Sequence, residues 1–407
     1  MMNTKDDSSA FNNFKKREKQ YKFFVDKKTD FSELITLPQH PSTTTPFTHP
    51  SIKSTILTHP RTGRPLAAYT FPTPSGLIII KNYTEPIDQL TIARQCINQY
   101  WKSPHRTNLY IYEKVELKGS INDLVAKEED KDCKEGKDEV KISEKEGMGS
   151  TGMTVGEDAG DCPCPCAHPM SAKAVENEPN TSTTGNKGGA RDYNKEHYMV
   201  SDHKRYFFNS KIRWSNVGYQ YNWDKRDYYP VASPIPIELS SMAKEVIGIL
   251  NLGGYNPEAL IINYYGARNF MGGHLDDGEP DQEHPIVSFS LGLSCVFLIG
   301  GRTKDTDPLA IRLDSGDVMI MSGESRRCYH GVPRILEDSV SLINSSELPK
   351  LAQQLDTETQ VAAPHDPAND SASSSSQVNT FTHTVNYLRE NRININFRQV
   401  VKDKQNK

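Results

Sequence analysis

Long apolar runs are missing from this chain of 407 residues. Because no stretch of 18 apolar residues occurs, a transmembrane helix is excluded. Residues 1–7 contain an acidic pair and no apolar run, which argues against a secretory signal and against a mitochondrial transit peptide. We expect an intracellular protein of the nucleus or cytoplasm, with the mitochondrion left open.

Cysteine is also scarce, with seven in the whole chain. In a protein without a secretory signal these thiols are expected to be reduced. Three cysteines and a histidine stand close together in residues 162–168, but alternate prolines hold this stretch extended. Paired zinc ligands usually have two or more residues between them. We therefore assign no role to this cluster.

Apolar residues make up only 35% of the chain, and the mean hydropathy is −0.65, which is low for a fully globular protein. Residues 114–200 are rich in Lys, Glu, Asp, Gly, Ser and Thr, and residues 346–378 combine Ala and Pro with a run of serines. Neither segment can bury enough apolar surface to offset its chain entropy. Both are predicted to be disordered insertions into one domain.

The net charge of −4 and the pI of about 6.3 do not by themselves indicate a polyanionic partner. Part of the acidic excess comes from the 114–200 insertion, so the folded core is expected to be nearer neutral or basic. Residues 11–28 interleave Lys and Arg with aromatic residues. They fit either a helix that contacts a nucleic-acid backbone or a solvated helix packed by its aromatic side chains.

The remaining segments predict an α+β fold. Leu77–Ile80 is typical of a buried strand, and apolar spacing predicts helices at residues 86–101 and 238–252. Residues 260–334 alternate short β-rich runs with Gly, Asp and Pro turns. A further helix is expected at residues 379–390. Many short strands flanked by a few helices favour a double-stranded β-helix, or jelly-roll, barrel buttressed by helices.

The predicted organisation along the chain has six parts. They are a basic N-terminal arm (1–30), an N-terminal α/β part of the catalytic domain (31–113), the first insertion (114–200), the core (201–345), the second insertion (346–378), and the final helix with a binding strand (379–407).

The final strand, residues 392–398, has one polar and one apolar face, because side chains alternate along a strand. Its polar face carries Arg392, Asn394, Asn396 and Arg398. The two guanidinium groups could bind the two ends of a small dicarboxylate, since the planar fork of Arg binds carboxylates bidentately. Taken alone, the pattern fits an ordinary amphipathic strand equally well.

A candidate metal site precedes this strand. His274 and Asp276 are one residue apart, so on a strand they point to the same side, and His330 offers a third ligand. Two histidines and one carboxylate form the facial triad of non-haem Fe(II) oxygenases, which leaves coordination positions open. Zinc is the alternative, although catalytic zinc usually keeps one open position and structural zinc none. The order of these ligands before the arginine strand makes the combination specific.

Several ordered motifs together resemble the AlkB family of Fe(II)- and 2-oxoglutarate-dependent nucleic-acid dioxygenases. Residues 212–224 further resemble the first eukaryotic AlkB homologue, whose members act on tRNA or DNA. The family motifs are Asn263-Tyr264-Tyr265, His274-x-Asp276, residues 285–292, residues 315–319 and residues 392–398.

The resemblance implies Fe(II) and 2-oxoglutarate as cofactors and O2 as a co-substrate. It implies hydroxylation of an N-methyl group on a nucleic-acid base, followed by loss of formaldehyde, in methylated tRNA or DNA. We expect no membrane partner and a monomer. Two alternatives use the same barrel: a protein hydroxylase on the same iron site, and a non-catalytic nucleic-acid-binding module.

The resemblance also implies roles for the cosubstrate residues. Arg392 should pair with the distal carboxylate of 2-oxoglutarate and Arg398 with the carboxylate near the metal. Asn263, Tyr265 and Asn394 should donate hydrogen bonds to the cosubstrate. For Tyr265, a buried tyrosine of the core is the alternative.

Substrate recognition requires that a base leaves its stack and lies against aromatic rings. Trp214, Tyr219 and Tyr221 belong to the dense aromatic cluster that lies near a motif. Gly278 stands where the bacterial pattern has an acidic base contact, and Lys304 stands near its lid arginine. These two departures favour methylated tRNA, or another structured RNA or DNA, over alkylation-damaged DNA.

Overall fold

Two antiparallel sheets form the centre of the computed structural model, which describes residues 12–22, 28–39, 51–102, 104–108, 212–222, 227–362 and 380–401. The larger sheet has the order β1 (Lys53–Thr58), β2 (Pro65–Thr70), β3 (Leu77–Ile80), β12 (Val318–Met321), β9 (Ile286–Gly292), β14 (Asn391–Arg398), β7 (Ala259–Gly266), β5 (Trp214–Asn222) and β4 (Arg106–Thr107), with β6 (Asp227–Ala232) paired to β5. The smaller sheet has the order β11 (Leu309–Leu313), β10 (Ser294–Ile299), β13 (His330–Leu336) and β8 (Met271–His274).

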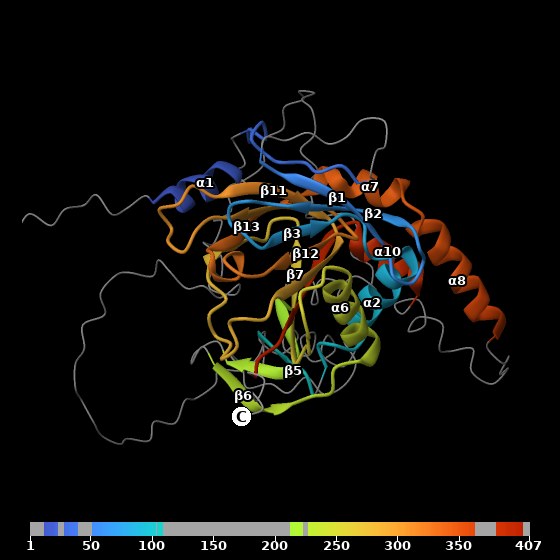
Figure 1. Cartoon of the computed structure of the whole chain (residues 1–407). Helices are drawn as coiled ribbons and strands as arrows, with labels where there is room; N and C mark the ends of the chain where they lie inside the picture. The colour runs from blue at the N-terminus through green and yellow to red at the C-terminus, as the bar shows by residue number, and fades with distance from the viewer. Residues whose placement is uncertain are drawn as a thin grey trace, which may run out of the picture.

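Helices cover the outer face of the larger sheet (Figure 1). They are α2 (Pro86–Asn98), α6 (Ile237–Ile249) and α10 (Phe381–Leu388). Each places a buried apolar stripe against the sheet, and Pro86 begins α2 where its missing N–H costs no helical hydrogen bond. The three helices lie close to their predicted positions, and α2 and α6 end about three residues earlier than expected.

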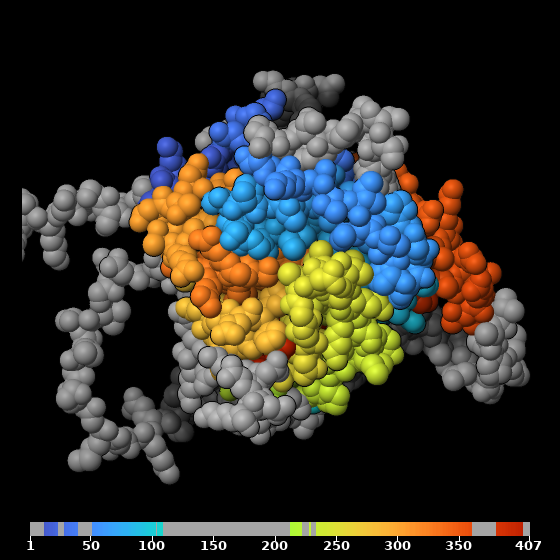
Figure 2. Space-filling model, in the orientation of Figure 1, coloured from blue at the N-terminus to red at the C-terminus, as the bar shows by residue number. Residues whose placement is uncertain are grey.

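Strands far apart in sequence lie side by side in the larger sheet. β3 pairs with β12, and Figure 2 shows the N-terminal strand residues, in light blue, next to the orange residues of the later strands on one face of the molecule. β14 lies between β7 and β9. The C-terminal strand therefore occupies the middle of the sheet.

The two faces of β14 differ as the alternation predicted. Ile393, Ile395 and Phe397 are at most 1% exposed and pack in the core under the helices. The polar face of the strand points toward the smaller sheet. A second apolar cluster lies between the two sheets. The larger sheet thus holds the helices on one side and the candidate site on the other.

Helix α1 (Asn13–Tyr21) lies beside β8 and β13 (Figure 1). The side chain of Asn12 caps its first turn, and Phe14 and Tyr21 are buried. The helix is shorter than residues 11–28, and its aromatic side chains pack it against the smaller sheet. No helix in the described part of the chain is long and apolar enough to cross a membrane.

The second predicted insertion, residues 346–378, is partly wrong. After α7 (Val340–Ser345), residues Leu348–Ala362 form α8, which packs against α2 and α10. Leu348 and Ala352 are at most 2% exposed. Their helical spacing was obscured by the serine-rich composition that follows. Residues 363–378, and the first insertion at 114–200, lie outside the described residues.

Candidate functional site

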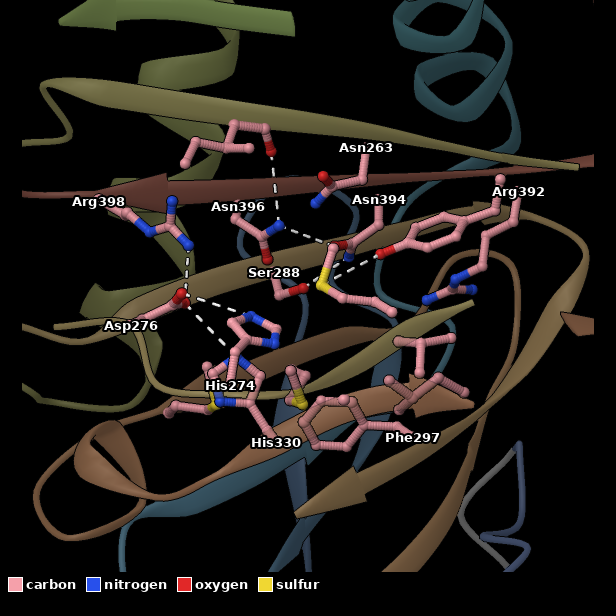
Figure 3. A pocket seen from close by; sticks show the side chains of 18 residues that line it. Asn263, His274, Asp276, Ser288, Phe297, His330, Arg392, Asn394, Asn396 and Arg398 are labelled. Carbon is pink, nitrogen blue, oxygen red and sulfur yellow. Dashed lines mark hydrogen bonds and ion pairs between the residues drawn. The ribbon is translucent and has the colours of Figure 1, made fainter. Parts of the chain in front are cut away.

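A pocket lies between the two sheets and is lined by residues of both (Figure 3). The larger sheet contributes the polar face of β14 together with Asn263 of β7 and Ser288 of β9. The smaller sheet contributes His274, His330 and Phe297, and Asp276 follows β8. The structure therefore brings together the predicted metal ligands and the predicted arginine strand in one cavity.

The candidate metal ligands converge because of strand pairing. β8 and β13 are antiparallel, and their register sets His330 directly opposite His274. Nε2 of His274 lies 3.6 Å from Oδ1 of Asp276, and Nε2 of His330 lies 3.5 Å from Oδ2. One ligand atom from each residue falls within 4.8 Å of the others. Among the described residues, this is the group of His, Cys, Asp and Glu side chains arranged to hold a metal ion.

Backbone carbonyls orient both imidazoles toward this centre. Nδ1 of His274 lies 3.0 Å from the carbonyl oxygen of Gly272, and Nδ1 of His330 lies 3.1 Å from that of Cys328. A carbonyl can only accept a hydrogen bond, so each Nδ1 carries a proton, and in the neutral imidazole Nε2 keeps the lone pair that a metal needs. Metal-binding histidines are commonly oriented in this way.

The electrostatics keep these side chains in metal-binding protonation states. Burial and the neighbouring His330 lower the pKa of His274 to about 4, so its imidazole is neutral near pH 7. Burial alone would raise the pKa of Asp276, but Arg398 and the two histidines hold that pKa well below its ordinary value. The site therefore presents a neutral imidazole at His274 and a carboxylate at Asp276.

At the metal end of the pocket, Arg398 pairs with protein carboxylates. Its Nη2 donates to Oδ2 of Asp276 at 2.7 Å, and its Nε lies 3.1 Å from Oε1 of Glu279. The side chain of Arg398 is 6% exposed. Two acidic groups therefore balance this guanidinium, and one of them is a candidate metal ligand.

Arg392 lies at the far end of the pocket from Asp276 (Figure 3), and its hydrogen-bond partners are neutral. Its Nη2 donates to the Ser290 hydroxyl at 2.7 Å and its Nη1 donates to the carbonyl of Leu293 at 3.2 Å. Arg392 is 1% exposed, its Nε has no hydrogen-bond partner, and no carboxylate of the described residues pairs with it. A buried cation without an anion is costly, so this end of the pocket fits a ligand carboxylate.

Amides occupy the middle of the pocket. Nδ2 of Asn394 donates to the Ser288 hydroxyl at 2.7 Å and to the carbonyl of Phe289 at 3.2 Å, and Asn396 donates to Oδ1 of Asn394 at 2.8 Å. Both N–H groups of Asn394 are thus engaged within the protein. The expected donation from Asn394 to the cosubstrate does not match this arrangement.

The other two predicted cosubstrate contacts face the cavity from β7. Oδ1 of Asn263 has no hydrogen-bond partner in the described part of the chain, and the amide lines the pocket. Tyr265 lines the pocket opposite Arg392 in the sheet, and its hydroxyl makes a 3.7 Å contact to the sulfur of Met271. Tyr265 is 3% exposed and also packs in the core between the sheets. Its position is therefore compatible both with a cosubstrate contact and with a buried tyrosine of the core.

The predicted base clamp is only partly compatible with the structure. Trp214 is completely buried at the start of β5, so its ring has no face for an incoming base, and that prediction is wrong. Tyr219 is half-buried, and Tyr221 is 8% exposed and stacks edge-on against Tyr228 of β6. Lys304 lies in the loop after β10, with its Nζ 5.4 Å from the ring centre of Tyr329, and does not line the pocket.

The donor set fits both groups that such a pocket would hold. Two imidazoles and a carboxylate on one side of a cavity suit Fe(II), which leaves other coordination positions open. Arg392 suits the far carboxylate of a dicarboxylate, because its buried charge lacks an anion.

The sequence profile of the 2OG-Fe(II) oxygenase superfamily matches residues 177–398, more than half of the chain. The chain therefore belongs to this superfamily, whose cofactors are Fe(II) and 2-oxoglutarate.

Within the superfamily it is similar to proteins named ALKBH1, in line with the resemblance of its motifs. It is 39% identical over 195 residues to the DNA N(6)-methyladenine demethylase ALKBH1A of Arabidopsis thaliana, which covers 47% of this chain and 49% of that protein. It is 35% identical over 200 residues to the nucleic acid dioxygenase ALKBH1 of Homo sapiens, covering 48% of each. The tRNA demethylase abh1 of Schizosaccharomyces pombe is 38% identical over 132 residues, covering 32% of this chain and 44% of that protein. The chain thus spans about half the length of the curated relatives it matches.

Several residues of the site were not anticipated. Ser288 and Ser290 belong to a recognised motif, but their bonds to Asn394 and Arg392 depend on the pairing of β9 with β14. Glu279 and Arg326 form a buried ion pair at 2.9 Å beside Asp276. An acid three residues after Asp276 was the only signal for Glu279, and Arg326 had none.

Proposed function

We propose that this protein is a dioxygenase that uses Fe(II) and 2-oxoglutarate to demethylate methylated bases in nucleic acid, with tRNA as the first candidate and DNA as the second. The observation that supports this most directly is the pairing, in one pocket, of a His-Asp-His cluster with a buried arginine that lacks an anion. Neither feature is needed by a binding module.

In this proposal His274, Asp276 and His330 hold the iron. Arg392 binds the distal carboxylate of 2-oxoglutarate, and Arg398 orients Asp276 and faces the carboxylate nearer the metal. When bound, the iron and 2-oxoglutarate together supply the oxidation by O2 of an N-methyl group, which is then lost as formaldehyde.

The chain's own residues orient the metal ligands and exclude water from the pocket. The carbonyls of Gly272 and Cys328 fix the tautomers of the two histidines, so the metal-facing nitrogens are available without proton loss. Phe297 and the apolar cluster between the sheets exclude water from the pocket. In a dry pocket, the attraction of Arg392 for a carboxylate is stronger than in water.

The arrangement of the two sheets supports a double-stranded β-helix. Every pairing between named strands is antiparallel, and the pocket lies between a large and a small sheet. We infer that β7, β8, β9, β10, β12, β13 and β14 form the jelly-roll, with β1 to β3 extending its larger sheet.

Nucleic acid as the substrate is supported by the names of the three relatives, which are a DNA demethylase, a nucleic acid dioxygenase and a tRNA demethylase. The β5–β6 hairpin (Trp214–Ala232, of which residues 214–222 and 227–232 are described) lies next to the metal loop at residues 276–279. Tyr221 packs there against Gly278: a Cβ on Gly278 would come within 2.6 Å of the Tyr221 ring. We propose this hairpin as the part of the molecule that meets the base.

The test is incubation of the protein with Fe(II), 2-oxoglutarate and either total methylated tRNA or methylated single-stranded DNA, followed by mass spectrometry of nucleosides. We expect one methylated nucleoside to fall and formaldehyde and succinate to appear in equal amounts. Asp276→Ala is the inactive control. Succinate without any loss of a methylated nucleoside, in both substrates, would redirect the proposal to a protein substrate.

A further inference from the structure

Glu279 lies at the centre of a buried network that joins three separate segments of the chain. Its side chain is 3% exposed, and it is the second acidic group beside Arg398. No expectation from the sequence gave it a role. From the metal loop, its contacts run to Arg398 of β14, to Arg326 and to Tyr228 of the β5–β6 hairpin.

On the pocket side, Glu279 holds two arginines. Its Oε1 lies 3.1 Å from Nε of Arg398, whose Nη2 donates to Asp276. Its Oε2 accepts from Nη2 of Arg326 at 2.9 Å, and Nη1 of Arg326 donates to the backbone carbonyl of Asp276. Two arginines thus connect Glu279 to both the side chain and the backbone of a candidate metal ligand.

On the hairpin side, Glu279 accepts a hydrogen bond from Tyr228 of β6 at 2.6 Å. Tyr228 in turn stacks edge-on against Tyr221 of β5, with ring centres 5.0 Å apart. Tyr221 covers Gly278, the residue next to Glu279. The hairpin is therefore fastened to the metal loop at two adjacent residues.

Charge balance makes this network sensitive to the loss of any member. Glu279 and Asp276 carry two negative charges, and Arg326 and Arg398 carry two positive charges. Arg326 is 1% exposed, so water cannot replace a missing partner. Buried charges need their partners, so the loss of the Glu279 carboxylate should displace the guanidinium of Arg398. For the same reason, a displacement of Tyr228 should displace Glu279.

We propose that Glu279 is a positioning residue that couples the β5–β6 hairpin to the cosubstrate site, through Tyr228 on one side and Arg398 and Arg326 on the other. This rests on the proposed function, in which the hairpin meets the base and Arg398 faces 2-oxoglutarate. Binding of 2-oxoglutarate then tightens the hairpin, and the two substrates bind cooperatively.

Two measurements without nucleic acid test the coupling. The first is the affinity of 2-oxoglutarate for the Fe(II)-loaded protein, titrated without oxygen. The second is backbone hydrogen exchange in residues 214–222 and 227–232, with and without 2-oxoglutarate. In the unmodified protein, we expect 2-oxoglutarate to slow exchange in the hairpin.

Three variants separate coupling from a structural role. Glu279→Gln keeps the shape and removes the charge, and should weaken 2-oxoglutarate binding by about tenfold, the lower end of the scale of one charged hydrogen bond, because Glu279 acts on the ligand through Arg398. Tyr228→Phe keeps the ring contact with Tyr221 and should weaken binding by about threefold and abolish the effect of 2-oxoglutarate on hairpin exchange.

Tyr255→Phe is the matched control: this nearby buried tyrosine has a hydroxyl without a partner in the described part of the chain, and its loss should change neither measurement.

The double variant Glu279→Gln, Tyr228→Phe completes the cycle. If the coupling runs through Glu279, adding Tyr228→Phe to Glu279→Gln should have no further effect on 2-oxoglutarate affinity. If Tyr228→Phe only lowers the melting temperature, with 2-oxoglutarate affinity and hairpin exchange responding as in the unmodified protein, the proposal is overturned. Loss of nucleic-acid demethylation with intact coupling would instead count against the proposed function alone.

Discussion

Arg392 and Arg398 lie at the two ends of the same face of β14, yet their charges are balanced in different ways. Arg398 pairs with Asp276 and lies beside Glu279, both from the protein. Arg392 has a serine hydroxyl and a carbonyl and, among the described residues, no carboxylate. Both are buried, so exposure to water does not explain the difference.

The contrast indicates which charge belongs to the protein and which awaits a ligand. A paired arginine stabilises the fold that surrounds it, because removing it would leave buried carboxylates unpaired. A buried arginine without an anion instead lowers the stability of the fold, and binding of a ligand carboxylate restores it. The guanidinium at the metal end is thus balanced by carboxylates of the protein, and the guanidinium at the far end is balanced only when a ligand carboxylate binds.

Asp276→Ala should have the largest effect, because it removes a metal ligand and the partner of Arg398 together. We expect Fe(II)-dependent succinate formation to fall below detection while the protein remains folded. Exposed Asp277 offers a neighbouring control, and Asp277→Ala should retain turnover. Full activity of Asp276→Ala would end the assignment of the metal site.

The comparison predicts that the same substitution has a large effect at one arginine and a small effect at the other, in the protein without metal or ligand. Arg398→Met should lower the free energy of unfolding by about 3–5 kcal/mol, because it leaves Asp276 without its buried partner. Arg392→Met should change it by less than about 1 kcal/mol, since no buried anion loses a partner. Urea denaturation of both variants provides the measurement. Equal losses at the two positions would mean that Arg392 is already balanced within the protein.

The part of the site that depends on alternation along a single strand could be predicted from the sequence. The polar and apolar faces of β14 follow from the period of two residues, and the apolar residues are indeed in the core. The convergence of His274 with His330 was expected from the motif order. Their opposition across β8 and β13 is the physical reason for it.

Features that depend on packing between distant segments could not be predicted. The burial of Trp214 depends on the position of β5 beside β7, and no local pattern distinguishes it from an exposed aromatic residue. Glu279 needs Tyr228, Arg326 and Arg398, which come from three other elements. Helix α8 was missed because composition was averaged over a segment whose first half is amphipathic.

Arg392→Lys tests the ligand end alone. The substitution keeps the charge and removes the bidentate fork, so 2-oxoglutarate affinity should fall by about 2–3 kcal/mol, the scale of a charged hydrogen bond. Iron binding should persist because no metal ligand changes. The measurement is titration of 2-oxoglutarate into the iron-loaded protein without oxygen.

Ile393→Ala on the opposite face is its control. It should lower the free energy of unfolding by about 2–5 kcal/mol through a core cavity and leave cosubstrate affinity unchanged. If Arg392→Lys bound normally while Ile393→Ala bound poorly, the strand would present its other face to the ligand.

The smallest effect is expected between the two arginines, at Asn396. Its Nδ2 donates to Oδ1 of Asn394 and so fixes the amide that holds Ser288. Asn396→Ala should weaken 2-oxoglutarate binding by about 0.5–1.5 kcal/mol, the net value of one neutral hydrogen bond, because it loosens the pocket wall without removing a charged contact. Asn386→Ala, at an exposed position of α10, is the matched control and should bind as the unmodified protein does. A loss of affinity at Asn396 as large as that of Arg392→Lys would show that the amides, rather than the unpaired guanidinium, dominate cosubstrate binding. The difference in charge balance between Arg392 and Arg398 would then not explain where the ligand binds.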